Sequence, residues 1–247
     1  MTKRIRLGIL TPSSNTSLEP LSQAIIAQLP NVSVHFSRFT VLKISLEQDA
    51  LQQFQNEAIL TAAKLLADAN VDIIGWSGTS SGWLGFPADE ELCELITAAT
   101  GIPATTSVLA LNKALKALSA TELGLVTPYM DNVQEAIIKT YQTIGVDCSK
   151  ERHLQLSNNS SFADVEESTL DEMVADLAGR QVQVISTFCT NLRAAQRVAY
   201  WEKTYGVTVL DTVNTVIWDM LLLCEVDPIA VQGWGRLFKL KSGRELR

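Results

Sequence analysis

The sequence predicts an α/β protein with two pseudo-symmetric lobes, each a parallel sheet flanked by helices, and an active site in the cleft between them. Three observations support this fold class. Short apolar segments alternate with longer segments of helical periodicity, which is the pattern of βαβ units. Segments of the first half recur in the second half in the same order. Polar residues follow several predicted strands, where open parallel sheets bind their ligands.

Three pairs of similar segments define the internal repeat. The pairs are 7–13 with 123–129, 71–79 with 182–190, and 100–104 with 205–209. The second pair aligns Gly78 with Cys189, so only one copy carries a cysteine at that position. We therefore expect a first repeat over 1–118, a second over 119–225, and a C-terminal tail over 226–247 that packs on the first lobe.

The elements of the first half follow from periodicity and from end signals. Residues 6–10 are short and apolar and end at Thr11-Pro12, which indicates a buried strand, and a helix is expected from Ser17 after three capping residues. A long helix is expected over 47–68, where Gly and Pro are absent, and Asn70 suits its C-terminal end. The other expected elements are strands at 32–39, 71–76 and 102–106, a loop at 78–85, and helices at 88–100 and 108–118.

The second half repeats this order. Gly206 is expected to stop one of its helices, as Gly101 does in the first half. The expected elements are strands at 123–127, 182–188 and 207–210, helices at 132–144, 165–178, 192–205 and 215–224, and a polar loop at 157–161.

Composition argues against several classes of protein. The formal charge of −7 opposes nucleic-acid binding, and no apolar run is long enough to span a bilayer. The N-terminus lacks the apolar segment of a signal peptide, so we expect a cytoplasmic protein. With two histidines, four scattered cysteines and no nucleotide or flavin motif, we expect free thiols, no metal and no cofactor.

Cys189 is the main candidate for chemistry. It follows a predicted buried strand and precedes a predicted helix, whose free N–H groups and positive dipole end would lower the pKa of the thiol. A buried structural cysteine is the alternative. Structural roles are expected for the other three cysteines, Cys93, Cys148 and Cys224.

Polar loops at the other strand ends supply further candidates. Thr79 and Ser80, after Gly78, offer hydroxyls and N–H groups that can hold a carboxylate or an enolate, although they also fit an ordinary Ser/Gly turn. Tyr129 follows a strand and a proline, so its hydroxyl can point into the cleft. The candidate substrate-binding residues are Pro12, Ser13, Ser14, Asn15, Thr190 and Asn191, of which Ser14 and Asn15 fit equally well as helix caps.

Four residues near these loops have simpler expected roles. Asp131 is expected to be the N-cap of the helix that follows it. Trp76, Trp83 and Phe188 either line an apolar pocket or belong to the core, and the core is the default expectation for large apolar side chains.

Two motifs in this chain resemble the Asp/Glu racemase superfamily, in particular its maleate cis-trans isomerase and arylmalonate decarboxylase branch. Residues 8–16 (GILTPSSNT) are similar to the N-terminal motif of the maleate isomerases, and residues 189–193 (CTNLR) to their second cysteine motif. The resemblance covers nearly the whole chain. It implies a cofactor-independent enzyme, a monomer or a small homo-oligomer, with a small dicarboxylate as substrate.

Gly78 departs from the isomerase pattern. The family's isomerases and racemases carry their first cysteine at this position, whereas arylmalonate decarboxylase carries glycine followed by Thr-Ser, as residues 78–80 do. Residues 126–131 also resemble the decarboxylase segment that bears its tyrosine. Ser14-Asn15 follow the isomerase style, so a dicarboxylate other than an arylmalonate stays open. By symmetry, Gly78→Cys is expected to restore two thiols and some racemase activity.

The preferred hypothesis is a decarboxylase of the arylmalonate decarboxylase type. Loss of CO₂ leaves an enediolate, and Cys189 delivers a proton to one face of it. The alternatives are a maleate isomerase or an Asp/Glu-type racemase that lacks the first cysteine, and a non-catalytic carboxylate-binding protein. The groups expected to hold the enediolate are Thr79, Ser80, Tyr129 and the backbone N–H of Thr190.

Overall fold

The computed structural model describes residues 3–48, 53 and 56–240, and it contains two parallel sheets of four strands each. The strands of the first sheet are β1 (Ile5–Pro12), β2 (Val32–Phe39), β3 (Ile73–Trp76) and β4 (Ala104–Thr106). Those of the second are β5 (Gly124–Thr127), β6 (Glu151–His153), β7 (Val184–Thr187) and β8 (Thr208–Asp211). The strand orders β2-β1-β3-β4 and β6-β5-β7-β8 are equivalent, which confirms the predicted fold class.

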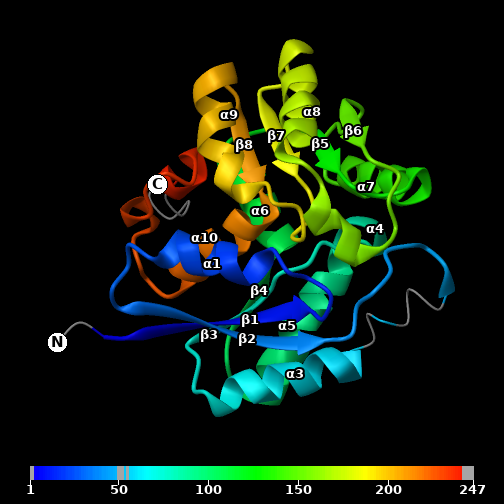
Figure 1. Ribbon diagram of the computed structural model, residues 1–247. Helices are drawn as coiled ribbons and strands as arrows, with labels where there is room; N and C mark the ends of the chain where they lie inside the picture. The colour runs from blue at the N-terminus through cyan, green and yellow to red at the C-terminus, as the bar shows by residue number, and fades with distance from the viewer. Residues whose placement is uncertain (1–2, 49–52, 54–55, 241–247) are drawn as a thin grey trace.

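Helices cover the faces of both sheets (Figure 1). In the first half they are α1 (Leu18–Ile26), α3 (Asn56–Asp68), α4 (Ser81–Leu84), α5 (Phe86–Thr100) and α6 (Ser107–Ala117). In the second half they are α7 (Asp131–Gln142), α8 (Glu167–Gly179), α9 (Val198–Tyr205) and α10 (Thr212–Leu223). Short 3₁₀ turns lie at Asn159–Asp164, Ala195–Arg197, Pro228–Ala230 and Arg236–Lys239.

Equivalent features mark the two copies of the repeat. Gly101 ends α5 at φ 73° and Gly206 ends α9 at φ 74°, both in the left-handed region that glycine tolerates without strain. The aligned segments 71–79 and 182–190 contain β3 and β7, which occupy the same place in their sheets.

Helix α10 connects the halves. It comes from the second half of the chain but lies against β3 and β4 of the first sheet. A Cβ atom added to Gly75 in β3 would lie 2.5 Å from Sδ of Met220, so only glycine permits this close approach. Asp219 of the same helix accepts hydrogen bonds from the Thr105 hydroxyl and, at 2.7 Å, from Nζ of Lys113. These contacts hold a helix from the second half of the chain against the first sheet.

The observed elements differ from the predicted ones in four places. Strand β6 was not predicted, because its sequence Glu-Arg-His is charged and it forms the sheet edge, bonded only to β5. The loop predicted at 78–85 contains the short helix α4. The helix predicted from 192 begins only at Val198, after a turn and a 3₁₀ segment. The helix predicted over 47–68 is observed as α3 from Asn56, and residues 49–52 and 54–55 lie outside the described part.

The segment after α10 contacts both halves. Gln232 exchanges hydrogen bonds with Gln28, next to α1. Further on, Leu237 and Phe238 are buried, and the 3₁₀ turn that contains them lies against β8 and α10. Within the described residues, no helix combines the length and the apolar character needed to cross a bilayer.

Candidate active site

A small cavity lies where the carboxyl ends of β1, β3, β5 and β7 meet. Its volume is about 20 Å³, which is room for about one water molecule, so a dicarboxylate enters only if the walls move apart. A larger, open depression of about 270 Å³ lies between α9 and the C-terminal segment, and none of the candidate residues line it. The small cavity is lined by Pro12, Val41, Ile44, Trp76, Gly78, Thr79, Ser80, Trp83, Tyr129, Asn159, Cys189 and Thr190.

Cys189 is the single cysteine of the four in this chain that lines the cavity. Burial raises the pKa of its thiol to about 11, although the nearby Tyr129 hydroxyl and the backbone N–H groups of Asn191 and Leu192 favour the thiolate. The predicted lowering of this pKa was therefore wrong. The expected helix end is absent at this position, since α9 begins at Val198, and desolvation outweighs the remaining donors. At neutral pH the group is a thiol that can donate a proton.

Tyr129 joins the two halves of the cavity wall. Its hydroxyl oxygen lies 2.7 Å from Oγ1 of Thr79 in the first half, and it lies near enough to the Cys189 thiol in the second half to favour the thiolate. The rings of Trp83 and Phe162 pack edge-on against the tyrosine ring at centroid distances of 5.4 and 5.7 Å. Burial raises the pKa of Tyr129 well above its usual value, so its hydroxyl stays a donor.

Thr190 and Asn15 form a second link between the halves. Nδ2 of Asn15 donates to Oγ1 of Thr190 at 3.2 Å, and that hydroxyl in turn donates to the carbonyl of Ser77 at 3.2 Å. Oδ1 of Asn15 accepts from the N–H groups of Ser17 and Leu18. Asn15 therefore holds two N–H groups at the start of α1, although Ser17 occupies the N-cap position, and it also positions the residue next to Cys189.

Asn191, Ser14 and Ser13 hold the loops around the cavity. Asn191 accepts from two N–H groups at the start of α1 and donates to the carbonyl of Asn159 at 2.6 Å. Asn159 donates from Nδ2 to Oγ of Ser14 at 2.7 Å, and Ser14 donates to the carbonyl of Val41. Oγ of Ser13 accepts from the Val41 N–H. Of the predicted binding residues, Pro12 and Thr190 line the cavity, and the others brace its walls.

Gly78 faces the indole ring of Trp76. A Cβ atom built on Gly78 would lie 2.0 Å from Cζ2 and 2.3 Å from Cε2 of that ring. The position that the repeat pairs with Cys189 therefore has no side chain, and the space beside it is filled by tryptophan. Trp76 and Trp83 belong to the buried core, as expected by default, and also line the cavity, whereas Phe188 packs against Tyr141.

Three cavity residues were missed by sequence reasoning. Val41 and Ile44 come from the segment after β2, and Asn159 from the polar stretch assigned as a loop. Their contact is nonlocal, since the Asn159 N–H donates to the carbonyl of Leu42 and the Ile44 N–H to that of Ser157. In the sequence, only the run of amide and hydroxyl side chains at 157–161 could have pointed to Asn159 as a cavity residue.

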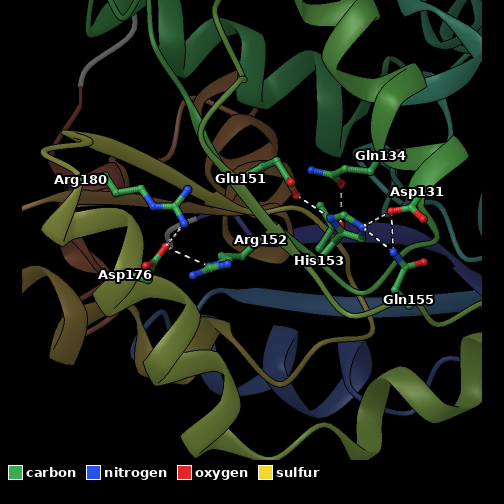
Figure 2. A network of polar contacts seen from close by, with 9 residues as sticks. Asp131, Gln134, Glu151, Arg152, His153, Gln155, Asp176 and Arg180 are labelled. Atoms are coloured by element: carbon green, nitrogen blue, oxygen red, sulfur yellow. Dashed lines mark hydrogen bonds and ion pairs between the residues drawn. The ribbon is translucent and has the colours of Figure 1, made fainter.

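Asp131 does not cap α7, contrary to the prediction. No side chain caps this helix, and Asp131 instead accepts from Gln155 and from Nε2 of His153, which lies 2.8 Å away (Figure 2). Nδ1 of His153 lies 2.7 Å from a Glu151 oxygen. The two carboxylates raise the pKa of His153 and outweigh its desolvation. This cluster ties the loop that carries Tyr129 to β6.

Comparison with known proteins assigns the family. The family model described as arylmalonate decarboxylase matches residues 12–238. The chain belongs to the arylmalonate decarboxylase family. It is 27% identical over 247 residues to the maleate isomerase of Nocardia farcinica, with 96% of both chains covered. It is also 27% identical over 188 residues to the arylmalonate decarboxylase of Bordetella bronchiseptica, covering 74% of this chain and 77% of that one.

A solved structure shares the fold closely. A variant of the Nocardia farcinica maleate cis-trans isomerase, with a covalently bound succinylcysteine intermediate, superposes with a TM-score of 0.88 at 21% identity and covers 96% of this chain and 99% of its own. The relatives are enzymes of two reaction classes, isomerases and decarboxylases. Which of the two reactions this chain catalyses therefore has to be inferred from the residues that line its cavity.

Proposed function

We propose that this protein is a cofactor-independent decarboxylase of a malonate-like dicarboxylate, with Cys189 as its proton donor. The observation that carries the proposal is the single thiol in the cavity. Racemisation needs an acid/base group on each face of the α-carbon, and position 78, which the repeat pairs with Cys189, is a glycine covered by Trp76. Decarboxylation needs a donor on one face only.

The protonation state of Cys189 favours the same reaction. Formation of a covalent succinylcysteine requires a thiolate, because the thiolate is the nucleophile. Burial holds the pKa of Cys189 at about 11, so the thiol form predominates at neutral pH. A protonated thiol is poorly suited to nucleophilic addition and well suited to protonating a carbanion.

The reaction proceeds in two steps that conserve charge and protons. In the first, the bond between the α-carbon and one carboxylate breaks, CO₂ leaves, and the bonding electron pair remains as an enediolate with the second carboxylate. In the second, the S–H proton of Cys189 passes to the α-carbon, and the resulting thiolate regains a proton from water. Enclosure by Trp76, Trp83, Val41 and Ile44 excludes water from the departing carboxylate.

The enediolate oxygens are held by the polar side of the cavity. Thr79 and Tyr129 are already hydrogen-bonded to one another, so both are oriented before substrate binds. Ser80 and the backbone N–H of Thr190 complete the proposed set of donors, and both residues line the cavity. Each such preorganised donor contributes about 3 kcal/mol of transition-state stabilisation in comparable sites.

A panel of substituted malonates tests the proposal, with maleate included. The expected result is CO₂ release from at least one malonate and its loss in Cys189→Ala, with the product carrying one deuterium at the α-carbon in D₂O. Full CO₂ release by the Cys189→Ala variant would contradict the role of the thiol. Absence of release from every acid would contradict the reaction itself.

Maleate isomerisation is the second candidate. It is favoured by the match to the Nocardia farcinica maleate isomerase along 96% of both chains and by Asn15, which belongs to the isomerase-like N-terminal motif and bonds to Thr190 beside the thiol. In this reaction water or a hydroxyl would have to replace the first cysteine, which is absent at Gly78, unless Cys189 itself acts as a thiolate. Conversion of maleate to fumarate without CO₂ release from any malonate would establish it and displace the decarboxylase proposal.

A further inference from the structure

We infer that Trp76 is the specificity-determining residue of this cavity: its indole N–H binds a substrate carboxylate and its ring closes the face that a first cysteine would serve. This inference rests on the proposed function for the identity of the ligand as a small dicarboxylate. It goes beyond that proposal because none of the donors assigned above belongs to Trp76.

The ring of Trp76 is fixed in place. Its side chain is 1% exposed, and its ring packs against that of Phe39 at a centroid distance of 5.0 Å. Cζ2 and Cε2 of the indole lie where a side chain on Gly78 would begin. Nε1 is bonded to Cε2, so the N–H lies next to the part of the ring that a side chain on Gly78 would meet, and Trp76 lines the cavity.

The N–H of Trp76 is buried without a hydrogen-bond partner among the described residues. Two other tryptophans satisfy this group: Nε1 of Trp201 donates to Asp171 at 2.7 Å, and Nε1 of Trp218 donates to the Leu240 carbonyl at 3.1 Å. An indole N–H can only donate, and a buried donor left unpaired is unfavourable. A carboxylate oxygen in the cavity supplies the missing acceptor, and its negative charge strengthens the bond.

The same ring sets the side from which protons arrive. The repeat pairs Gly78 with Cys189, and the ring of Trp76 occupies the space of a residue-78 side chain. An α-carbon held between them faces a thiol on one side and an aromatic carbon surface on the other. Proton delivery is therefore confined to the Cys189 side, and a single enantiomer results from a prochiral acid.

The indole N–H signals report binding directly. The chain has five tryptophans, so a ¹H–¹⁵N spectrum contains five indole N–H signals. The signals of Trp76 and Trp201 are identified by their loss in Trp76→Phe and Trp201→Phe. Phenylmalonate, methylmalonate and maleate are titrated into the Cys189→Ala variant, in which we expect turnover to be slow enough for binding to be measured. We expect the Trp76 signal to move downfield with at least one acid while the Trp201 signal stays. Saturable binding with an unmoved Trp76 signal, or no binding by any of the three acids, overturns the inference.

Affinity provides a second measurement on the same variant. We expect Trp76→Phe to weaken binding of the acid by roughly 10-fold or more, since a hydrogen bond to a charged group is lost, and Trp201→Phe to leave it unchanged. The two proposals fail separately. CO₂ release together with unchanged affinity in Trp76→Phe overturns the role of Trp76 and keeps the decarboxylase. A ligand-dependent Trp76 shift without CO₂ release from any malonate overturns the decarboxylase and keeps the carboxylate contact.

Discussion

The loops after β3 and β7 are copies of one another with different chemistry. At the end of β7, Thr187 donates to the Asp211 carboxylate at 2.7 Å, and Cys189 two residues later lines the cavity. At the end of β3, Trp76 stands at the position of Thr187, and its ring covers Gly78 at the position of the cysteine. The strand before the loop is retained in both halves, while one loop holds a proton donor and the other an apolar wall.

The supports beneath the two loops remain alike. In the first half, Asp89 accepts from Ser81 at 2.7 Å and from the Thr106 hydroxyl, which caps α6. In the second half, Asp211 accepts from Thr187 and caps α10 itself. Burial raises the pKa of both carboxyls to about 6. The comparison therefore predicts that two loops with similar supports have different roles, and that only the loop after β7 delivers a proton.

The largest expected effect is the loss of the proton donor. Cys189→Ala should lower the rate of CO₂ release by 10²- to 10⁴-fold, the usual contribution of a general acid, and lower the free energy of unfolding by about 1–2 kcal/mol. Cys148→Ala is the matched control, because Cys148 is fully buried but lies outside the cavity. Rates are measured by CO₂ release and stability by urea unfolding. An equal loss of rate in both variants would mean that the effect is structural.

The hydroxyl of Tyr129 comes next. Tyr129→Phe removes a donor that contacts both Thr79 and the Cys189 sulfur, and it should lower kcat by about 10²- to 10³-fold. Tyr141→Phe is its control, since the Tyr141 hydroxyl is buried without a partner among the described residues. Removing an unpaired hydroxyl should leave kcat unchanged and stability equal or slightly higher. Comparable rates for Tyr129→Phe and the parent would remove this tyrosine from the mechanism.

Local periodicity was sufficient to predict the two parallel sheets and the loops at their carboxyl ends, because β1, β3, β5 and β7 are apolar strands followed by polar residues. It was insufficient for β6, a charged edge strand. The prediction of a low thiol pKa failed because desolvation depends on the surrounding tertiary structure, which no local pattern records. The contribution of Asn159 was likewise hidden, since its contacts with Ser14 and Leu42 join segments more than a hundred residues apart.

The buried carboxyls predict a stability effect with a definite sign. The folded pKa of Asp211 is about 6 and its ordinary value is 3.8, so folding favours the protonated acid. This contribution of about 3 kcal/mol is fully present below pH 4 and is lost as the pH rises through 6. Asp211→Asn should therefore match the parent near pH 4 and be more stable at pH 7. Asp89→Asn should behave alike, since burial raises its pKa in the same way.

Asp131→Asn tests the sign of that argument. Asp131 is exposed, and its bonds to His153 and Gln155 lower its pKa. Its contribution is present above the ordinary pKa of 3.8 and is lost only as the pH falls below that value through the lower folded pKa, so this variant should be less stable than the parent from pH 7 down to about 4 and approach it at about pH 2. Urea unfolding between about pH 2 and pH 7 measures all three variants. A response of Asp211→Asn without one of Asp89→Asn would show that the two loops are not supported alike.

The smallest expected effect concerns the glycine itself. Symmetry alone predicts that Gly78→Cys restores a two-thiol racemase, but the Cβ of such a residue would lie 2.0 Å from the Trp76 ring. The single variant should therefore lose about 1–3 kcal/mol of stability from overpacking and show little α-proton exchange. Urea unfolding and deuterium incorporation into a 2-aryl acid measure the two effects.

Space for the new thiol requires a smaller residue at position 76. In the double variant Gly78→Cys/Trp76→Leu, stability should recover by about 1 kcal/mol or more relative to Gly78→Cys. Exchange of the α-proton with D₂O should appear, while Trp76→Leu alone shows none because it has only the Cys189 thiol. Gly78→Cys alone could instead be as stable as the parent and exchange the proton. In that case the Trp76 ring moves aside easily, and Gly78 rather than Trp76 causes the chemical difference between the two loops.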